Sequence, residues 1–372
     1  MSTKNQARIF LTGATSLQGG AFLACLLSSG YEEPLTCLVR VPDQETAEER
    51  TRRSVARFGL QPSTRLPRAW NVLPGDLLSE EWHDAPALRG TTHVMHLAAN
   101  TSFGSNGGIR KTNVEGALSV ARAMRNQPQE RYVHTGTATI CGAAPPHVVH
   151  EDDYPSDKAI HQAPYTRSKA EAERLLAERY ADLPVVVARP SIVVGHTELG
   201  CRPSGSIFWV LRTVDALRFI TWDPQNRIDV IPVDWAASAL RHLLLTPELH
   251  HKRYHVSAGA AGAIRWEELA AEYARLTGGE ASNRYEVGSM RQLTHHRIAQ
   301  QLGHGHGRHL RLALELYYRF CSLDLVFDNQ RLLDAGVPPP RFTEYMAKCV
   351  VTSTCSIYGQ MRIDLEPALT LV

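Results

Sequence analysis

Tyr165 and Lys169 are the two side chains of this sequence whose types and spacing best fit a chemical step. They lie four residues apart in Tyr-Thr-Arg-Ser-Lys, within a stretch of helical composition over 165–180, so both should lie on one helix face. A phenol has a pKa of about 10 and transfers protons poorly near neutrality unless its anion is stabilised. A nearby ammonium group supplies that stabilisation. The pair predicts proton transfer to an alkoxide, although the same spacing also occurs by chance on surface helices.

A hydroxyl group precedes this pair, at the end of a predicted strand over 131–135. There the chain continues as Gly136-Thr137-Ala138-Thr139. A hydroxyl at a strand end can donate a hydrogen bond to a substrate carbonyl and polarise it. Thr137, Tyr165 and Lys169 are therefore predicted to act together on a carbonyl group.

A glycine-containing turn near the N-terminus fits dinucleotide binding. It follows a predicted strand over 8–12 and opens a predicted helix over 20–29, the context that a dinucleotide fingerprint requires. Gly13 permits the tight turn, Gly19 permits close packing of helix on strand, and the helix N-terminus offers N–H groups to a pyrophosphate. Ser16 takes the place of the middle glycine, where its side chain would either crowd the cofactor or bond to it. The predicted cofactor residues of this turn are Gly13, Thr15, Ser16, Leu17, Gln18 and Gly19. An ordinary strand–helix turn is the alternative interpretation.

Arg40 indicates which dinucleotide binds. It ends the second predicted strand, 35–40, where NAD-specific enzymes carry an acidic residue that bonds the ribose 2′-hydroxyl. A guanidinium group instead suits a 2′-phosphate, so we predict NADP(H); the alternative is a solvated strand-end residue. Asp76 follows a third strand end and can contact the adenine or simply serve the turn Pro74-Gly75-Asp76. The remaining predicted cofactor residues are Leu77, Ala98, Lys169, Pro190 and Ile192.

Alternating strands and helices must position these residues. Further strands are predicted at 93–98 and 185–188 and a helix at 111–125, and such alternation favours parallel strands covered by helices on both faces. We predict an α/β fold with a doubly wound parallel sheet of the Rossmann type. Residues 1–190 would form the dinucleotide-binding core, with returning strands at 229–233 and 254–256 (near 228–257). Residues 191–227 and 258–372 would form a smaller, interleaved C-terminal substrate-binding portion.

The order of these motifs resembles the extended short-chain dehydrogenase/reductases. In that family a Ser or Thr lies at this strand end and Tyr-x-x-x-Lys follows on the next helix. The resemblance implies that Thr137 is the active-site hydroxyl, Tyr165 the acid/base and Lys169 its partner. It also matches Asn113, within Asn-Val-Glu-Gly, to a residue that often supports the active site; a helix-start or buried polar role is the alternative.

Within that family the sequence resembles thioester reductases. The resemblance rests on Cys-Leu-Val-Arg ending at Arg40, Pro-Gly-Asp-Leu at 74–77, His-Leu-Ala-Ala at 96–99, Ala-Arg-Pro-Ser at 188–191 and especially Asp-Val-Ile-Pro-Val-Asp at 229–234. Fatty acyl-CoA reductases and the terminal reductase domains of carboxylic acid reductases and peptide synthetases share these patterns. The resemblance implies NADPH-dependent reduction of an acyl thioester, held on CoA or on an acyl or peptidyl carrier protein, to an aldehyde and potentially on to an alcohol. Gly136 and Thr139 depart from many fatty acyl reductases, which have Ser and Tyr there.

Composition narrows the class of protein further. A net charge of +2 gives no general attraction to nucleic acid. The seven cysteines form no CxxC pair, and we find no signal peptide or run long enough for a transmembrane segment, so a cytoplasmic protein is expected. The stretch 303–309 and the pair His295-His296 are rich in His but lack acidic or Cys ligands nearby, so we predict no metal and a mobile loop.

Several alternatives stay open at this point. The protein could act on a free ketone, aldehyde or alcohol, or on a sugar nucleotide, or be a non-catalytic NADP-binding sensor. Residues 208–211 are either core or part of a substrate channel. Three arginines could steer a phosphopantetheine or CoA phosphate or simply be surface charge: Arg202, Arg212 and Arg218. The acyl group and the oligomeric state are not predicted.

Overall fold

A seven-stranded parallel sheet forms the centre of the protein in the computed structural model, which describes residues 6–41, 46–61, 63–102, 108–278, 285–303 and 307–362. Its strands are β1 (Ile9–Thr12), β2 (Leu35–Val39), β3 (Trp70–Pro74), β4 (His93–His96), β5 (Arg131–Thr135), β7 (Val185–Pro190) and β12 (Arg253–Val256). They are ordered β12-β7-β5-β4-β1-β2-β3, and every neighbouring pair is parallel. This order places the chain reversal next to β1, where ligands bind in doubly wound folds.

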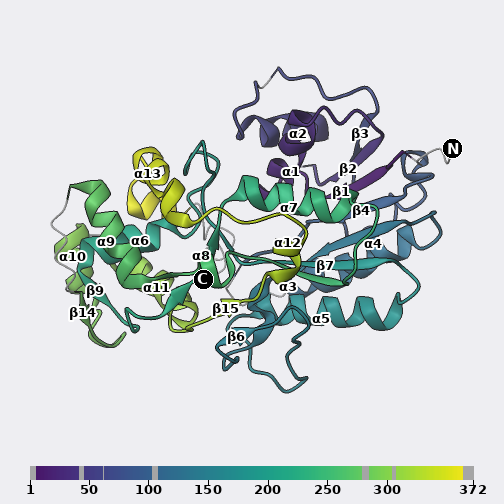
Figure 1. Ribbon diagram of the computed structural model, residues 1–372. Coiled ribbons are helices and arrows are strands. Elements are labelled where there is room, and N and C mark those ends of the chain that lie inside the picture. The colour runs from purple at the N-terminus through teal and green to yellow at the C-terminus, as the bar shows by residue number, and fades with distance from the viewer. Residues whose placement is uncertain are drawn as a thin grey trace.

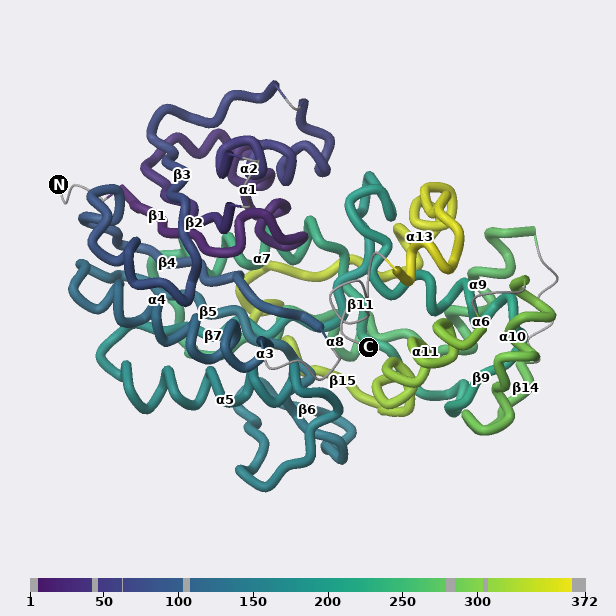
Figure 2. The backbone as a smooth tube through the Cα atoms, turned by 180° about the vertical axis from the view of Figure 1, so that it is seen from behind, coloured from purple at the N-terminus to yellow at the C-terminus, as the bar shows by residue number. Residues whose placement is uncertain are grey.

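Helices cover both faces of this sheet (Figures 1 and 2). One layer holds α1 (Leu17–Ser28), α2 (Ala47–Ala56) and α7 (Val233–Leu245), with α1 packed along α7. The other holds α3 (Gly108–Arg110), a π-helical turn (Lys111–Glu115), α4 (Gly116–Met124) and α5 (Pro164–Arg179). Strands β1, β2 and β5 are buried along their whole length, as inner strands between two helix layers should be. The predicted doubly wound parallel sheet is confirmed.

A second lobe lies beside the sheet and has a hydrophobic core of its own. Its helices are α6 (Phe208–Leu217), α9 (Trp266–Thr277), α10 (His295–Leu302), α11 (Gly307–Cys321) and α13 (Phe342–Thr352). Phe208 and Trp209 are almost completely buried in this core. Of the two interpretations of 208–211, core packing therefore describes these side chains.

Short elements complete the two parts. The two-stranded pairs are β8 (Ile192–Val193) with β11 (Val230–Ile231), β9 (Phe219–Ile220) with β14 (Glu286–Val287), β10 (Arg227–Ile228) with β13 (Ile264–Arg265), and β6 (Val148–Val149) with β15 (Val326–Phe327). The short helices are Pro86–Leu88, Ala138–Cys141, α8 (Gly259–Gly262) and α12 (Gln330–Asp334). Helix α12 lies against β12, and Leu332 packs in the cluster that covers the sheet. The C-terminal third thus contributes to both parts.

Two expectations about local structure were wrong. The segment 229–233 does not return to the central sheet, because Val230–Ile231 pairs only with the short strand β8 and Val233 already begins α7. Pro232 is the N-cap residue of α7 and Asp234 lies in its first turn, both common at helix starts. Within 303–309, the residues from Gly307 onward form the beginning of α11 rather than a loop; residues 304–306 lie outside the described residues.

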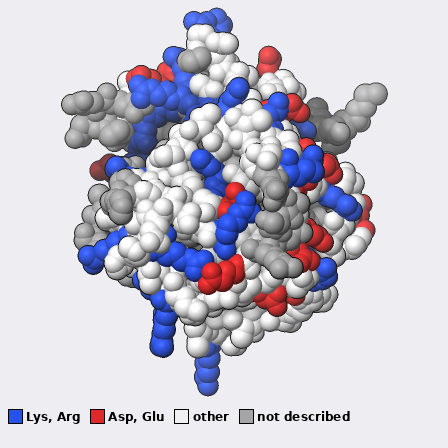
Figure 3. Space-filling view, turned by 90° about the vertical axis from the view of Figure 1, so that its left-hand side faces the viewer, with Lys and Arg blue, Asp and Glu red and all other residues white. Residues whose placement is uncertain are grey.

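Charged residues are interspersed on the outer face of the second lobe. Lys and Arg form several separate groups there, with Asp and Glu among them (Figure 3). Arg212 donates to Ser353 Oγ (3.1 Å) and to the Cys355 carbonyl (2.7 Å). Arg218 pairs with Asp215 at 3.3 Å. These two guanidinium groups are therefore engaged in structural contacts within the lobe.

Asp229 joins the second lobe to the edge of the sheet. Its carboxylate is buried and accepts hydrogen bonds from the backbone N–H groups of Ala258 (2.7 Å) and Gly259 (3.1 Å). Burial raises the pKa of Asp229 to about 6, and these two hydrogen bonds act in the opposite direction. The first residue of the 229–234 motif thus fixes the turn that follows β12.

Replacing Asp229 by Ala should destabilise the protein by about 2–4 kcal/mol, because two buried N–H groups lose their acceptor. Urea unfolding followed by circular dichroism measures this loss. The control is Asp223→Ala, which removes an exposed carboxylate that accepts one local backbone bond and should cost less than about 1 kcal/mol. Equal losses in the two variants would contradict the role given to Asp229.

Candidate active site

Three side chains of α5 meet three consecutive residues at the end of β5. Tyr165, Lys169 and Glu173 are spaced by four and share one face of the helix. The Tyr165 hydroxyl is hydrogen-bonded to the Thr137 side chain. The Lys169 ammonium donates to the Thr135 carbonyl at 2.6 Å. The Glu173 carboxylate lies against Gly136, where a Cβ atom would come within 2.2 Å of its Oε1 atom.

Tyr165 is poised as a proton donor in this arrangement. Its ring reaches solvent in part, but loss of hydration around the hydroxyl raises its pKa to about 12, with the Thr137 hydrogen bond acting in the opposite direction. The phenol therefore carries its proton near neutrality.

Lys169 is a buried charge. Its side chain is 3% exposed, and burial lowers its pKa to about 8 against the opposing effect of the Glu173 carboxylate. The ammonium form therefore dominates at neutral pH and is lost as the pH rises through about 8.

Thr137 lies at the N-terminus of the short helix Ala138–Cys141. Its hydroxyl is 2.9 Å from the Thr139 hydroxyl and 3.4 Å from the Pro190 carbonyl. Thr137 and Tyr165 are thus brought together, and Pro190 at the end of β7 lies on the same side. Ile192 follows at the start of β8 and is partly buried.

Asn113 links the segment after β4 to helix α5 through hydrogen bonds. It is buried in the π-helical turn and bonds both backbone groups of Asn100 (2.7 and 2.9 Å). Its amide also donates to the Ser168 hydroxyl at 2.9 Å, beside Lys169 in the sequence. With these three bonds Asn113 is placed to position α5 rather than to touch a substrate.

The first turn forms a cradle that fits a dinucleotide. Gly13 has φ = +77°, in the left-handed region that favours glycine, and a Cβ atom on it would lie 2.5 Å from the Ala98 nitrogen. A Cβ atom on Gly19 would lie 2.0 Å from the Gly13 carbonyl oxygen. This close packing leaves backbone room at the N-terminus of α1, where a pyrophosphate is favoured. Ser16 caps that helix, since its hydroxyl accepts from Gly19 N–H at 3.0 Å.

Three further residues of this turn were predicted to contact the cofactor. Thr15, Leu17 and Gln18 are each partly buried. The Gln18 Oε1 atom is itself buried and has no hydrogen-bond partner among the described residues. The turn therefore presents both backbone and side-chain polar groups.

Guanidinium groups surround the end of β2. Arg40 is exposed directly after this strand, and Arg50 on α2 donates to its carbonyl oxygen. Arg57 donates to the carbonyls of Thr15 (3.1 Å) and Ser16 (3.0 Å). The sequence interpretation missed Arg57, which α2 brings back to the glycine turn; a basic residue at the end of the helix after Arg40 was the available signal.

Asp76 and Leu77 follow the C-terminal end of the edge strand β3 in the sequence. The Asp76 carboxylate accepts from Leu78 N–H at 2.9 Å, as a turn residue does. Leu77 is partly buried and packs near Gly116 at the start of α4. Contact of both residues with the adenine stays a prediction. Asp76 in addition serves its turn through the bond to Leu78.

Two buried histidines lie beneath Lys169. His96 and His134 are paired in register on β4 and β5, and their rings stack with centroids 5.4 Å apart. His96 bonds Thr12 Oγ1 at 2.7 Å, whereas neither ring nitrogen of His134 has a hydrogen-bond partner among the described residues. Burial and the Lys169 ammonium lower the pKa of His96 to about 3 and that of His134 well below its usual range. Both rings are therefore neutral.

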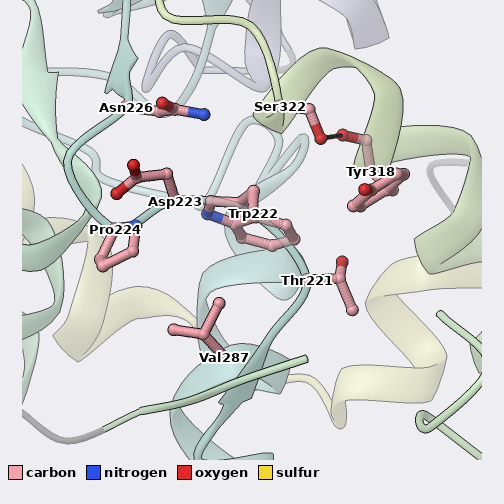
Figure 4. Close-up of a pocket in the computed structure, with 8 residues that line it drawn as sticks. All are labelled: Thr221, Trp222, Asp223, Pro224, Asn226, Val287, Tyr318 and Ser322. Carbon is pink, nitrogen blue, oxygen red and sulfur yellow. Dashed lines mark hydrogen bonds between the residues drawn. The ribbon is translucent and has the colours of Figure 1, made fainter. Parts of the chain in front are cut away.

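Two cavities of the structure are not lined by any residue of the predicted site. One of about 640 Å³ lies in the second lobe, between the segment after β9 and the end of α11 (Figure 4). Its lining includes Trp222, Asp223, Asn226 and Tyr318, and no residue of the predicted site. A smaller one of about 250 Å³ lies closer, beside Ala138 and Arg189.

Within the described ranges, no three His, Cys, Asp or Glu side chains gather closely enough to hold a metal ion; His304 and His306 lie outside these ranges. Among the helices that the structure describes, none combines the length and apolar character needed to cross a bilayer.

The fold and the site define an oxidoreductase of the extended short-chain dehydrogenase/reductase class, which uses a nicotinamide cofactor. Residues 11–240 match the male sterility protein family of NAD-binding proteins, and the chain belongs to this family. The sequence is 28% identical over 274 residues to the non-canonical nonribosomal peptide synthetase FrzA of a Cladobotryum species, covering 68% of this chain and 26% of FrzA. The chain thus spans about a quarter of the length of this relative.

Two solved structures share the fold. The terminal R domain from the myxalamid PKS-NRPS biosynthetic pathway superposes with a TM-score of 0.71 at 21% identity, covering 94% of this chain and 91% of that one. A thiolation-reductase di-domain from an archaeal nonribosomal peptide synthetase gives 0.70 at 16% identity, covering 93% and 75%.

Gly19→Ala should weaken binding of the nicotinamide dinucleotide about tenfold or more, because the added methyl group would force α1 away from the Gly13 carbonyl and distort the pyrophosphate cradle. Fluorescence titration with NADPH measures the affinity. Ser28→Ala, at the exposed end of the same helix, should bind as the unchanged protein does. Undiminished binding by Gly19→Ala would refute the cradle.

Proposed function

We propose that this protein reduces an acyl thioester with NADPH, releasing an aldehyde and a free thiol. The observation that carries the proposal is the contact of Tyr165 and Lys169 with residues 135–137 at the end of β5. A buried ammonium beside a protonated phenol suits protonation of an alkoxide. The similarity to a peptide synthetase and to the R-domain fold supports a thioester as the carbonyl compound.

The residues of this chain would divide the reaction between them. Thr137 and Tyr165 hold the carbonyl oxygen through their hydroxyl groups. A bound nicotinamide supplies the hydride that reaches the carbonyl carbon. Tyr165 gives its proton to the resulting alkoxide while Lys169 stabilises the phenolate that remains. The neutral hemithioacetal then breaks its carbon–sulfur bond, and the thiol leaves with the hydroxyl proton to give the aldehyde.

Charge around the end of β2 supports NADPH over NADH. Arg40 follows the strand where an NAD-specific site carries an acid, and Arg57 lies at the neighbouring turn. A 2′-phosphate would accept charge-assisted hydrogen bonds from this region.

We favour a carrier-bound thioester as the substrate. One structural neighbour joins a thiolation unit to a reductase unit, and CoA thioesters are the alternative carrier. In this proposal, residues 1–190 with the returning segment near 228–257 hold the cofactor, and 191–227 and 258–372 receive the acyl chain. The last segment also returns to the sheet through α12.

A substrate panel tests the proposed function. NADPH oxidation is followed by absorbance with carrier-bound acyl thioesters, short- and long-chain acyl-CoAs, and the matching free aldehydes and ketones, while released thiol is measured in parallel. Turnover of a thioester with thiol release supports the proposal, and aldehydes accepted in addition would extend the product to an alcohol. Turnover of free aldehydes or ketones alone would overturn it. Cofactor binding without any turnover would favour a sensor instead.

Tyr165→Phe should lower turnover by about 10²–10⁴-fold, because the ring stays and the proton donor is lost. NADPH affinity should change little. Steady-state rates on the best substrate of the panel measure the effect, with Tyr180→Phe at the end of the same helix as the matched control. Full activity in Tyr165→Phe would remove the acid role from this residue.

Arg40→Ala should weaken NADPH binding by about 10–100-fold and leave NADH binding nearly unchanged, because only the 2′-phosphate contact is lost. Titration with both cofactors gives the ratio. Arg53→Ala removes an exposed guanidinium that pairs with Glu49 on α2 and should keep the original preference. An Arg40→Ala variant that keeps it too would exclude Arg40 as the phosphate ligand.

A further inference from the structure

A buried ion pair lies directly behind Lys169. Glu173 is one helical turn beyond Lys169 on α5 and is 4% exposed. Its Oε2 atom accepts from Arg189 Nη2 at 2.8 Å and from Arg189 Nε at 3.1 Å. Arg189 on β7 is fully buried and also donates to the carbonyls of Glu151 (3.2 Å) and Asp153 (3.0 Å). The carboxylate is therefore held in one place by a guanidinium that is itself fixed.

Gly136 makes room for this carboxylate at the end of β5. A Cβ atom at this position would lie 2.2 Å from Glu173 Oε1, so the glycine lets the carboxylate approach the backbone. The preceding residue, Thr135, accepts the Lys169 ammonium through its carbonyl. The Lys169 ammonium and the Glu173 carboxylate thus contact two consecutive residues, Thr135 and Gly136.

The titratable and charged groups that face Lys169 lie on four elements. On α5 they are Tyr165, which is protonated, and the Glu173 carboxylate. On β4 and β5 they are His96 and His134, both neutral and both disfavoured as cations by Lys169. On β7, Arg189 is bonded to Glu173 and directed to it. Among these described groups, the Glu173 carboxylate is the one that favours the ammonium form of Lys169 against the cost of burial.

We propose that Glu173 is a positioning residue for the Tyr165–Lys169 pair, and that its carboxylate keeps Lys169 charged at the pH at which the enzyme works. Arg189 and Gly136 serve this role by fixing the carboxylate and by admitting it to the turn. The inference rests on the proposed function for its effect on catalysis. Its effect on the charge of Lys169 is a property of the protein alone and can be measured without cofactor or substrate.

The sign of the effect follows from the charges. Lys169 stabilises the Tyr165 phenolate only while it is an ammonium, so activity falls as the pH rises through the Lys169 pKa, about 8 in this protein. Removing the Glu173 charge leaves burial unopposed and lowers this pKa further. The alkaline limb of the pH–rate profile should then move to lower pH.

Lysine-selective carbon-13 labelling of the full chain provides the direct measurement, because the sequence has few lysines: Lys4, Lys111, Lys158, Lys169, Lys252 and Lys348. The Cε resonance of Lys169 is assigned by its loss in Lys169→Arg and is titrated by NMR. In Glu173→Gln its midpoint should fall by about one pH unit. In Glu178→Gln, which neutralises an exposed carboxylate paired with Arg174 on the same helix, it should not move.

Further variants keep the test decisive if Glu173→Gln folds poorly, because that change leaves Arg189 buried without its partner. The double variant Glu173→Gln/Arg189→Gln removes both charges and should lower the Lys169 midpoint by less than Glu173→Gln does, because loss of the Arg189 cation acts in the opposite direction. Glu173→Asp keeps the charge at a greater distance and should lower it by less. An unchanged Lys169 midpoint in Glu173→Gln or in the double variant would overturn the proposal.

Rates separate this inference from the proposed function. The pH dependence of kcat/KM on the best thioester should show its alkaline limb shifted down in Glu173→Gln, with kcat at pH 6 reduced far less than at pH 8. A uniform loss at every pH would indicate a structural role and contradict the inference. If the unchanged protein reduces no thioester, the proposed function fails, while the NMR titration still decides the role of Glu173.

Discussion

The burial of the Lys169 ammonium is the constraint on which the rest of the site depends. Burying an unpaired charge in a protein is unfavourable because the charge loses its hydration. Two nearby groups offset this loss for Lys169. The Thr135 carbonyl accepts from the ammonium, and the Glu173 carboxylate lies one helical turn away. The imidazole rings of His96 and His134 lie beneath the ammonium. Both are neutral, so they place no second positive charge next to Lys169. Two buried cations, Lys169 and Arg189, lie on either side of the buried Glu173 carboxylate.

The parallel sheet explains why these groups meet. Because all seven strands run the same way, the carboxyl ends of β1, β4, β5 and β7 share one edge, and the residues that follow them form the cofactor turn and the catalytic turn together. Helix α5 lies on one face of the sheet, and its polar side chains at every fourth residue reach this edge at the end of β5. The close packing at Gly13 and Gly136 brings backbone near to backbone or carboxylate, so glycine at these points is a requirement of packing.

Much of this could be predicted from the sequence, because periodicity and motif order act locally. The alternation of elements gave the sheet, and the spacing of Tyr165 and Lys169 placed both on one helix face. Contacts that depend on strand register were not accessible: His96 meets His134 only because β4 and β5 pair in register. Glu173 and Arg189 lie on different elements, and their pairing needs the packing of α5 on β7. The segment 229–233 resembled a strand of the central sheet, but only Val230–Ile231 forms a strand, paired with β8, and Pro232 is already the N-cap of α7.

The most direct test of the central claim follows the hydride. NADPH carrying deuterium at both C4 positions is mixed with a carrier-bound acyl thioester and the protein, and the aldehyde and thiol are measured by mass spectrometry and thiol titration. Thioester reduction at this site should give deuterium at C1 of the aldehyde and one free thiol for each NADPH oxidised in forming it. Thiol release with no deuterium in the product, or NADPH oxidation that never releases thiol, would contradict thioester reduction at this site.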